Sequence, residues 1–376
     1  MINCEFDKMN KTSFVVILAV GILLSFGFVM VFNTSSAEVL DRLLEIDTHA
    51  AFFKQVLFAM LGFFLGLFVW KIGYKAIFRL SPWLMLFVSI MLILVFIPGI
   101  GQQLNGAKRW IRFGGFTIQP SEMAKFIIPF YFANRLSEVP IQSVNFKFLL
   151  KILFTIGVTL SLILFEPDNG TCIIIMSTLV MLFFLMRVKF IYWALPLLCL
   201  TTVGSIAGYN MPHVRSRIRV YLHPEEDILG KGHQPYQAKI AAGSGRGIGK
   251  GLGQSLQKLN YLPEARSDYI AAIFAEEFGF LGISFMIILY MIIAGGGFYI
   301  AVKAREIEGF YLATIITFLI TFQGFLNLGV VSGLLPSKGV TLPFFSQGGT
   351  SLIVNIMAIF LLIQVAYEKE KSKATA

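Results

Sequence analysis

Charged side chains are scarce in this sequence. Only 14% of its 376 residues are Asp, Glu, Lys or Arg, whereas 56% are hydrophobic. A soluble domain carries about 25% charged residues, so this composition excludes an ordinary soluble enzyme. The sequence therefore predicts an integral membrane protein.

Cysteine and histidine are also scarce, with three and four copies. The cysteines form neither a disulfide framework nor a zinc motif. His213, His223 and His233 share one loop, but their spacing of ten residues suits no metal site on a single element. We therefore predict no protein-bound metal site from these residues.

Long apolar runs fill most of the chain. A membrane-spanning helix needs about 20 mainly apolar residues. By that criterion the sequence predicts an all-α membrane protein of about ten transmembrane helices in a single domain, residues 1–376. The predicted spans are 13–33, 50–70, 78–98, 119–135, 147–165, 171–187, 189–209, 268–301, 309–331 and 345–367. The first is too long for the apolar region of a signal peptide, and no cleavage site of small residues follows it.

The net charge of +10 does not indicate nucleic-acid binding, because the basic residues are not gathered in one soluble region. Most of them lie in alternate connections between the predicted spans, which places them on the same side of the membrane, as the positive-inside rule requires. The segment after the first span is instead mainly acidic. This pattern predicts that both termini are cytoplasmic. It also predicts a large extracytoplasmic loop, about residues 210–267, between spans seven and eight.

The segment 106–125, GAKRWIRFGGFTIQPSEMAK, breaks the positive-inside rule. It places Lys108, Arg109 and Arg112 outside, with Trp110 among them. One interpretation is a belt of snorkelling side chains with an interfacial tryptophan. The other is a phosphate-binding rim, since the planar donor fork of arginine suits phosphate oxygens.

The same segment leads into a predicted helix that begins at Pro120, with Ser121 in its first turn. Glu122 and Lys125 are three residues apart, so they share a helix face and can pair. Charges at membrane depth face the bundle interior or a water-filled cavity. The pair is therefore expected to fix the packing of this helix, to line a cavity, or to do both.

The segment EPDNGT, residues 166–171, separates spans five and six. Pro167 and Gly170 indicate a tight turn, and Asp168 or Asn169 is expected to cap the following helix. A turn with a cap accounts for this segment better than catalysis does.

The predicted outer loop is too long for a plain connection. Residues 237–242 are expected to form a short helix, and six glycines then alternate from Gly243 to Gly253. Glycine lets backbone N–H groups approach an anion. A flexible surface loop explains the same composition, and no Walker A spacing is present.

Asp268 lies where this loop meets the next helix, and the helix dipole there favours an ionised carboxylate. An ordinary capping aspartate would give the same pattern. Glu276 and Glu277 lie deeper in the same apolar helix, where carboxylates are costly unless paired. Adjacent helical residues point about 100° apart. At most one glutamate is therefore expected to face the same cavity as Asp268, with the other paired to a basic residue.

The last polar segment is LLPSKGVTLPFFSQGGTS, residues 334–351, which includes Lys338. Its two prolines and three glycines favour a loop that folds back into the bundle. Such backbone is tolerated at membrane depth where protein or water surrounds it. An ordinary outer loop is the alternative.

Four of these segments together resemble one family. GAKRWIRFGGFTIQPSEMAK, EPDNGT, GRGIGKGLGQSLQKLNYLPEARSDYIAAIFAEEFG and LPSKGVTLPFFSQGGTS are similar, in this order, to motifs of the SEDS family of bacterial shape, elongation, division and sporulation proteins. SLQKLNYLPEARSD and LPSKGVTLPF resemble the division branch, FtsW, more than the elongation branch, RodA. Arg266, Ser267 and Gln347 depart from the residues usual in these motifs.

The resemblance implies a peptidoglycan glycosyltransferase in the bacterial cytoplasmic (inner) membrane at the division septum. It would polymerise lipid II by an inverting mechanism, beside a class B penicillin-binding protein and other divisome proteins. A divalent cation, Mg²⁺ or Mn²⁺, is an optional support, and no other cofactor is expected. The alternatives are an elongation polymerase of the RodA type, a lipid II flippase, or a scaffold that only recruits the division machinery.

The resemblance also assigns roles to residues. Asp268 falls on the family's catalytic aspartate, and we expect it to act as the general base. The positions expected to line the substrate cavity are Lys108, Arg109, Trp110, Arg112, Ser121, Glu122, Lys125 and Lys338. We add Glu277 as the deeper carboxylate that is expected to face the same cavity.

Overall fold

The computed structural model describes residues 11–41, 48–104, 107–113, 116–140, 144–194, 198, 221, 230, 232–259 and 262–374. The helices are α1 (Lys11–Asp41), α2 (Ala50–Ile72), α3 (Tyr74–Arg79), α4 (Ser81–Leu94), α5 (Pro120–Ser137), α6 (Phe146–Phe165), α7 (Asn169–Leu185), α10 (His233–Ser244), α11 (Ile270–Val302), α12 (Ile307–Val331) and α13 (Gly349–Ala374). The strands are β1 (Gly101–Leu104), β2 (Ala107–Phe113) and β3 (Phe116–Ile118).

The predicted helical membrane architecture is confirmed. Each predicted span except 189–209 coincides with a helix, and that span lies largely outside the described residues. Six of the described helices are long and apolar enough to cross a membrane, and α4 and α7 are shorter apolar helices. The total of ten spans and the boundaries of the large outer loop stay predictions.

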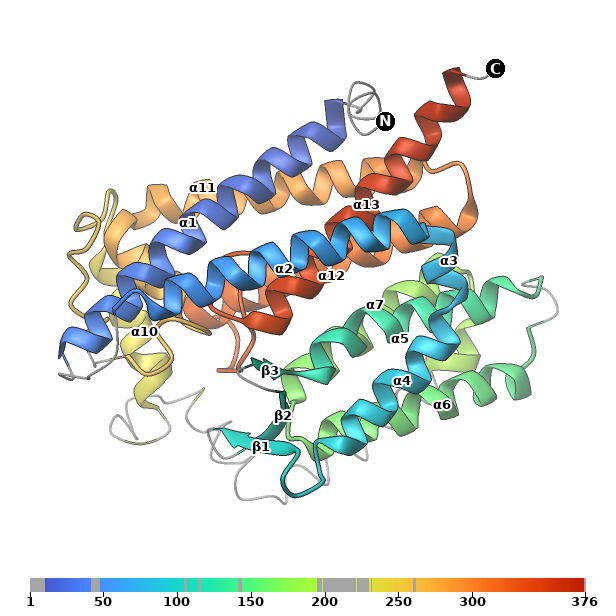
Figure 1. The fold of residues 1–376 in the computed structure, drawn as a ribbon, viewed down its shortest axis with the longest axis horizontal. Coiled ribbons are helices and arrows are strands. Elements are labelled where there is room, and N and C mark those ends of the chain that lie inside the picture. The colour runs from blue at the N-terminus through green and yellow to red at the C-terminus, as the bar shows by residue number, and fades with distance from the viewer. Residues whose placement is uncertain are drawn as a thin grey trace.

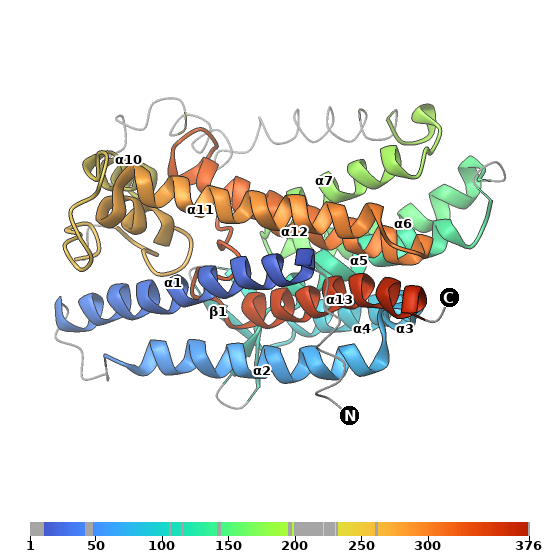
Figure 2. The ribbon, with the colours of Figure 1, turned by 90° about the horizontal axis from the view of Figure 1, so that it is seen from above.

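The helices pack as two groups (Figures 1 and 2). In the first group α1 packs on α11, α2 on α13, and α11 on α12. In the second group α5 packs on α4, α6 and α7. The helix α12 contacts both α5 and α7 and joins the two groups.

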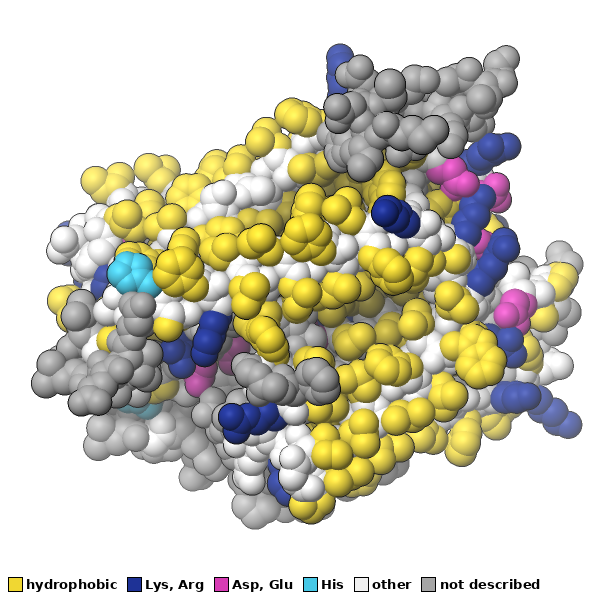
Figure 3. All heavy atoms as spheres, viewed as in Figure 1, with side chains coloured by type: hydrophobic (Ala, Val, Ile, Leu, Met, Phe, Trp, Pro, Cys, Tyr) yellow, Lys and Arg dark blue, Asp and Glu magenta, His cyan; other side chains and the backbone are white. Residues whose placement is uncertain are grey.

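Apolar side chains cover much of the outer surface of the bundle (Figure 3). On α6, for example, Phe154 and Phe165 are 73% and 75% exposed. In water such exposure would be unfavourable, because contiguous apolar patches on soluble proteins are small. These faces are therefore the lipid-facing surface of the bundle.

A small antiparallel sheet, in the order β1-β2-β3, precedes α5. The all-α expectation missed it. Two-residue stretches, Asn-Gly at 105–106 and Gly-Gly at 114–115, separate the strands in the sequence. Such pairs are strong hairpin signals, and they were outweighed by the apolar runs on either side.

The segment between α12 and α13 is folded back into the bundle, as one of the two interpretations predicted. Most of residues 340–346 are buried. The Pro343 carbonyl accepts a hydrogen bond from the Tyr290 hydroxyl at 2.6 Å, and the Ser346 carbonyl accepts one from Gln55 Nε2 at 3.1 Å. In α1, a Cβ on Gly27 would lie 2.7 Å from the Phe344 carbonyl oxygen, so glycine permits this close packing.

The helix α11 is broken at Gly279, whose φ of 64° and ψ of −160° are not helical. The break leaves main-chain groups without intrahelical partners, and the glycine-rich loop supplies replacements. Four hydrogen bonds do so: Lys250 N–H to Glu276 O, Gly251 N–H to Glu277 O, Phe280 N–H to Arg246 O, and Leu281 N–H to Gly247 O, at 2.9–3.1 Å.

Glycine is required in the loop because the two backbones touch. A Cβ on Gly245 would lie 1.9 Å from the Ala275 carbonyl oxygen, and one on Gly249 would lie 2.2 Å from that of Glu277. At Gly245 and Gly249, glycine therefore serves backbone packing, which neither the anion-binding nor the flexible-loop interpretation anticipated. The short helix predicted at 237–242 is confirmed as the longer α10.

Candidate active site

Asp268 lies in the turn that precedes α11. The turn is fixed from both sides, because its Ser267 and Tyr269 N–H groups donate to the Glu264 carbonyl at 3.2 Å. The Asp268 carbonyl accepts a hydrogen bond from Asn327 Nδ2 of α12 at 2.8 Å. The capping position of α11 is Tyr269, and no side chain caps the helix there. Asp268 is therefore not an ordinary capping aspartate.

The Asp268 carboxylate is half-buried, and no described residue donates a hydrogen bond to it. Burial raises its pKa from 3.8 to about 7. Burial is the largest cause of this pKa, which also includes an increase from the Glu264 charge, a decrease from Arg109, and smaller increases from Asp168 and Glu122. A carboxylate that titrates near neutral pH and has no fixed partner is well suited to accept a proton from a substrate.

Arg109 projects from β2 toward the turn between α6 and α7. Its Nε donates to the Glu166 carbonyl at 2.9 Å, and its Nη2 donates to the Pro167 carbonyl at 2.6 Å. A guanidinium has five N–H donors, so these two bonds leave others available for a ligand. The turn thus holds a cation close enough to Asp268 to influence its charge.

The other two cations of the basic segment are more exposed than Arg109. The pairing of β2 with β1 shifts register at Arg109, because Gln102 pairs with Trp110 and Gln103 pairs with Lys108. The regular alternation of side chains along the strand is therefore interrupted at this residue. Lys108 and Arg112 are exposed, and Trp110 is half-buried. Of this predicted rim, Arg109 is the residue whose charge acts on the pKa of Asp268.

Asp168 caps α7, as predicted, through the Thr171 N–H at 3.2 Å. Its carboxylate also accepts hydrogen bonds from the Ser121 hydroxyl at 2.8 Å, the Thr171 hydroxyl at 2.9 Å and Gln119 Nε2 at 3.2 Å. Ser121 and Asp168 together tie the first turn of α5 to the first turn of α7. Their polar atoms are committed to positioning these helices.

The predicted pair of Glu122 and Lys125 is confirmed, with Nζ and Oε2 2.6 Å apart. Lys125 is 1% exposed and also donates to Gln323 Oε1 of α12 at 2.7 Å. Gln323 Nε2 in turn donates to the Thr341 carbonyl at 2.8 Å. The pair thus joins α5 to α12 and to the folded-back segment beneath the site.

Lys338 lies in the folded-back segment and is half-buried. The residue after it, Gly339, lies against Asp268, because a Cβ there would be 2.9 Å from Asp268 Oδ2. The Val340 carbonyl accepts a hydrogen bond from Asn327 Nδ2 at 2.7 Å. The backbone of this segment therefore forms one wall around the aspartate.

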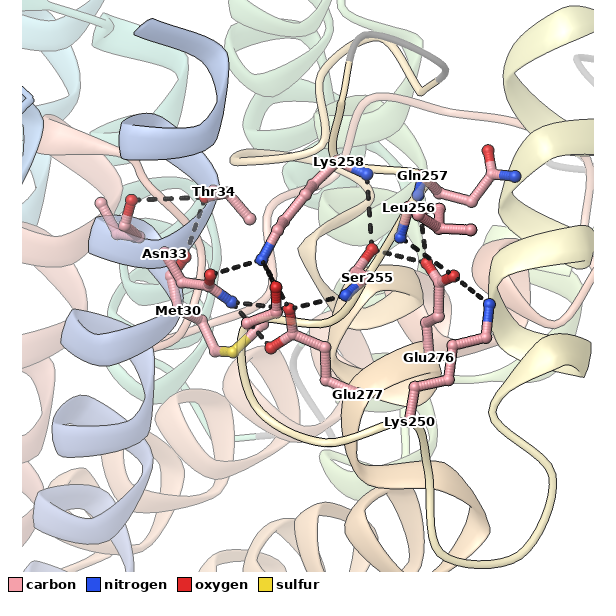
Figure 4. Close-up of polar contacts among 12 residues, drawn as sticks. Met30, Asn33, Thr34, Lys250, Ser255, Leu256, Gln257, Lys258, Glu276 and Glu277 are labelled. Carbon is pink, nitrogen blue, oxygen red and sulfur yellow. Dashed lines mark hydrogen bonds and ion pairs between the residues drawn. The ribbon is translucent and has the colours of Figure 1, made fainter. Parts of the chain in front are cut away.

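Glu277 belongs to a separate cluster deeper in the molecule (Figure 4). Its carboxylate accepts hydrogen bonds from Asn33 Nδ2 of α1 at 2.7 and 2.8 Å and from Lys258 Nζ at 3.0 Å. The adjacent Glu276 pairs with Lys250 at 2.6 Å and accepts the Ser255 hydroxyl. Both glutamates are paired with lysines. Glu277 was expected to face the same cavity as Asp268, but its hydrogen bonds place it in this separate cluster instead.

The chain is similar to known proteins in both sequence and fold. The sequence profile described as cell cycle protein, that of FtsW, RodA and SpoVE, matches residues 14–371. The chain belongs to this family. It is 36% identical over 365 residues to a probable peptidoglycan glycosyltransferase FtsW of Thioalkalivibrio sp. (strain K90mix), covering 96% of this chain and 91% of the relative.

Another member of the family is similar over the same share of this chain. The stage V sporulation protein E of Bacillus subtilis (strain 168) is 34% identical over 367 residues, covering 96% of this chain and 98% of that protein. Solved structures agree in fold. A chain of a peptidoglycan synthase complex, studied for the coordination of polymerization and crosslinking, matches with a TM-score of 0.76 and 23% identity, covering 94% of this chain and 97% of that one. RodA of Thermus thermophilus matches with a TM-score of 0.68 and 23% identity, covering 94% and 96%.

Glu166, in the turn between α6 and α7, was not predicted from the sequence as a residue of the site. It is fully buried, and neither carboxyl oxygen has a hydrogen-bond partner among the described residues. Burial raises its pKa to about 9, with Asp168 adding to the rise and Arg109 opposing it. Burial therefore favours the protonated, uncharged form of Glu166. Asn327 was missed as well, because a single asparagine in an apolar helix carries no spacing signal.

The acidic residues that the structure describes do not form a metal site by themselves. Within the described part of the chain, no three His, Cys, Asp or Glu side chains lie close enough together to hold a metal ion. Asp168 already accepts hydrogen bonds from three residues. A divalent cation near Asp268 would have to take most of its ligands from the substrate, and its involvement stays a prediction.

Proposed function

We propose that this chain is a peptidoglycan glycosyltransferase that polymerises lipid II, with Asp268 as its general base. The relatives named FtsW, at 36% and 35% identity over nearly the whole chain, support the activity. The observation that carries the residue assignment is the Asp268 carboxylate, which has no hydrogen-bond donor among the described residues and has a pKa near neutral.

The reaction needs one base. The 4-hydroxyl oxygen of the acceptor sugar attacks C1 of the donor sugar, and its proton passes to Asp268. The C1–O bond to the lipid pyrophosphate breaks, and the undecaprenyl pyrophosphate leaves with the bonding electrons. A single displacement converts the α-linked donor to a β-linked product, so a second catalytic carboxylate is not required.

Cations stabilise the leaving pyrophosphate. Arg109 is the cation that the geometry favours, because it lies close to Asp268 and retains unused N–H donors. Lys338 lies next to Gly339, which touches Asp268. Lys108 and Arg112 are exposed and would act at longer range, by attracting the anionic headgroup.

The cellular role follows from the same relatives. Two relatives that cover nearly the whole chain carry the names FtsW and stage V sporulation protein E, which supports a role in septal wall synthesis rather than in elongation. Similarity to a chain of a complex that coordinates polymerization and crosslinking supports a class B penicillin-binding protein as partner. The orientation with both termini in the cytoplasm and the septal location belong to this proposal.

The test is glycan synthesis from lipid II by the purified chain together with its transpeptidase partner. Asp268→Asn is expected to lower the rate about 10²- to 10⁴-fold, the usual contribution of a general base, with folding and partner binding retained. Glu138→Gln is the matched control, since it removes a carboxylate at the opposite end of α5 and should leave the rate unchanged. Polymerisation retained by Asp268→Asn would refute the base assignment.

A second measurement separates polymerase from flippase. If the chain instead moves lipid II across the membrane, liposomes that contain the native chain and liposomes that contain the Asp268→Asn variant should translocate the lipid equally well. Translocation that is independent of Asp268, without any glycan product from the native chain, would replace the proposed activity with transport.

A further inference from the structure

A cavity of about 350 Å³ lies at the end of the bundle opposite to Asp268. It is formed where α5 and α7 end and α12 begins. Its walls are mainly apolar, and include Leu136, Leu185, Met186 and Ile307. Arg187 and Tyr311 add polar groups to this lining. Ligand pockets in proteins have volumes of about 300–1,000 Å³ and combine apolar walls with a few polar groups in this way.

Arg187 differs from several cations at the same end of the bundle. Lys75 pairs with Glu368 at 2.8 Å, and Arg79 pairs with Glu308 at 3.2 Å. The Arg187 side chain is exposed and makes no hydrogen bond or ion pair with the described residues. The Tyr311 hydroxyl likewise has no partner in the described part of the chain. Two donors at this cavity are therefore available for an anion.

The backbone at Arg187 is also unusual. Its φ of 54° lies in the left-handed region, and the residue directly follows the C-cap of α7. Glycine is the ordinary residue in this position of a helix end, because a Cβ is disfavoured there. This left-handed residue ends α7 at the cavity, and Arg187 is one of the residues that line it.

We propose that this cavity binds one anionic phospholipid, with the lipid phosphate at Arg187 and Tyr311 and part of an acyl chain against the apolar wall. Lysines and arginines gather with the acidic residues at this end of the molecule, at the right-hand edge of Figure 3. Basic pockets between membrane-spanning helices bind anionic lipid headgroups. A soluble phosphate would leave the apolar wall uncovered, whereas the acyl chain of a membrane lipid covers it.

Native mass spectrometry of the full chain in detergent tests the proposal, with phosphatidylglycerol and phosphatidylcholine added in equal amounts. We expect the native chain to retain phosphatidylglycerol preferentially. Arg187→Gln should reduce that retention about tenfold, the effect of losing one charge-assisted hydrogen bond, and Tyr311→Phe should reduce it less. Lys147→Gln, which removes a cation at the start of α6 that does not line the cavity, is the matched control and should retain the lipid as the native chain does.

Two further measurements keep the proposal falsifiable. Ile307→Trp fills the cavity without changing charge and should also reduce retention, while unchanged retention would place the lipid elsewhere. Glycerol 3-phosphate at millimolar concentration should not displace the lipid, because it lacks the acyl chain. Equal retention of both phospholipids, or displacement by glycerol 3-phosphate, would overturn the assignment of an anionic phospholipid to this cavity.

Discussion

The helix α11 and the turn before it carry acidic side chains in two contrasting environments. Asp268, in the turn, has a carboxylate that no described residue contacts by a hydrogen bond. Glu276 and Glu277, about two helical turns deeper, each pair with a lysine and accept further hydrogen bonds. This difference distinguishes the proposed catalytic carboxylate from the carboxylates that hold structural elements together. The carboxylates that join elements together are saturated with hydrogen-bond donors, whereas the carboxylate proposed as the base accepts none from the described residues.

The largest effect on stability is expected from Lys258→Met. Glu277 is 1% exposed, and this substitution would leave its charge buried without the cation. Removing one partner of a buried pair costs about 3–5 kcal/mol, so the variant should lose its fold at a much lower temperature in detergent. The double variant Lys258→Met with Glu277→Leu should recover much of the loss. No recovery would show that the two side chains contribute independently.

A smaller loss of stability is expected from Gly279→Ala. The φ of 64° with ψ of −160° is accessible essentially to glycine alone, and forcing another residue there costs about 1–3 kcal/mol. The added Cβ would also lie 2.4 Å from the Gly249 nitrogen. Gly247→Ala is the matched control, since a Cβ at Gly247 meets nothing within 4 Å. Equal melting temperatures for the two variants would contradict the close contact between the loop and the broken helix.

The pH dependence of polymerisation tests the available carboxylate directly. A base must be deprotonated to act, so the rate should rise with pH through about 7, the pKa of Asp268. Below that value the rate should fall about tenfold per pH unit. Glu264→Gln removes a negative charge that raises this pKa, so its acid limb should move to lower pH. An acid limb that stays in place would mean that another group limits the rate.

The smallest effect is expected for the stability of Asp268→Asn. The carboxylate has no hydrogen bond from the described residues to lose, and the substitution keeps its shape. Away from specific interactions, substitutions change stability by about 0.5 kcal/mol or less. The melting temperature should therefore stay close to that of the native chain although activity is lost. A large drop would place Asp268 with the saturated glutamates, contrary to the comparison.

Local patterns in the sequence predicted much of this structure. The spacing of Glu122 and Lys125 predicted their pair, and Asp168 was expected as the cap that it is. Each of these interactions joins residues only three positions apart in the sequence, Glu122 with Lys125 and Asp168 with Thr171. The partners of Glu277 were not predictable in this way, because Asn33 lies 244 residues away in the sequence.

The missed features share that cause. The need for glycine at Gly245 and Gly249 is evident only once the backbone of α11 is known to lie against them, and Glu166 becomes noteworthy only when its burial is known. The assignment of Asp268 as the catalytic aspartate came from the family resemblance, because its position alone was equally typical of a cap. What the structure adds is that its carboxylate remains without a hydrogen-bond donor in the described part of the chain.

The break at Gly279 also makes the length of a short segment important. Between Asp268 and the break lies a stretch of helix that begins at Ile270 and ends at Phe278. A helix rises about 1.5 Å and turns about 100° per residue. Removing one residue from this stretch would therefore move Asp268 about 1.5 Å along the helix axis toward the break and rotate its side chain about 100° away from Gly339. The number of residues in this segment sets the position and orientation of Asp268 relative to the break. That number is therefore constrained even where individual side chains are replaceable.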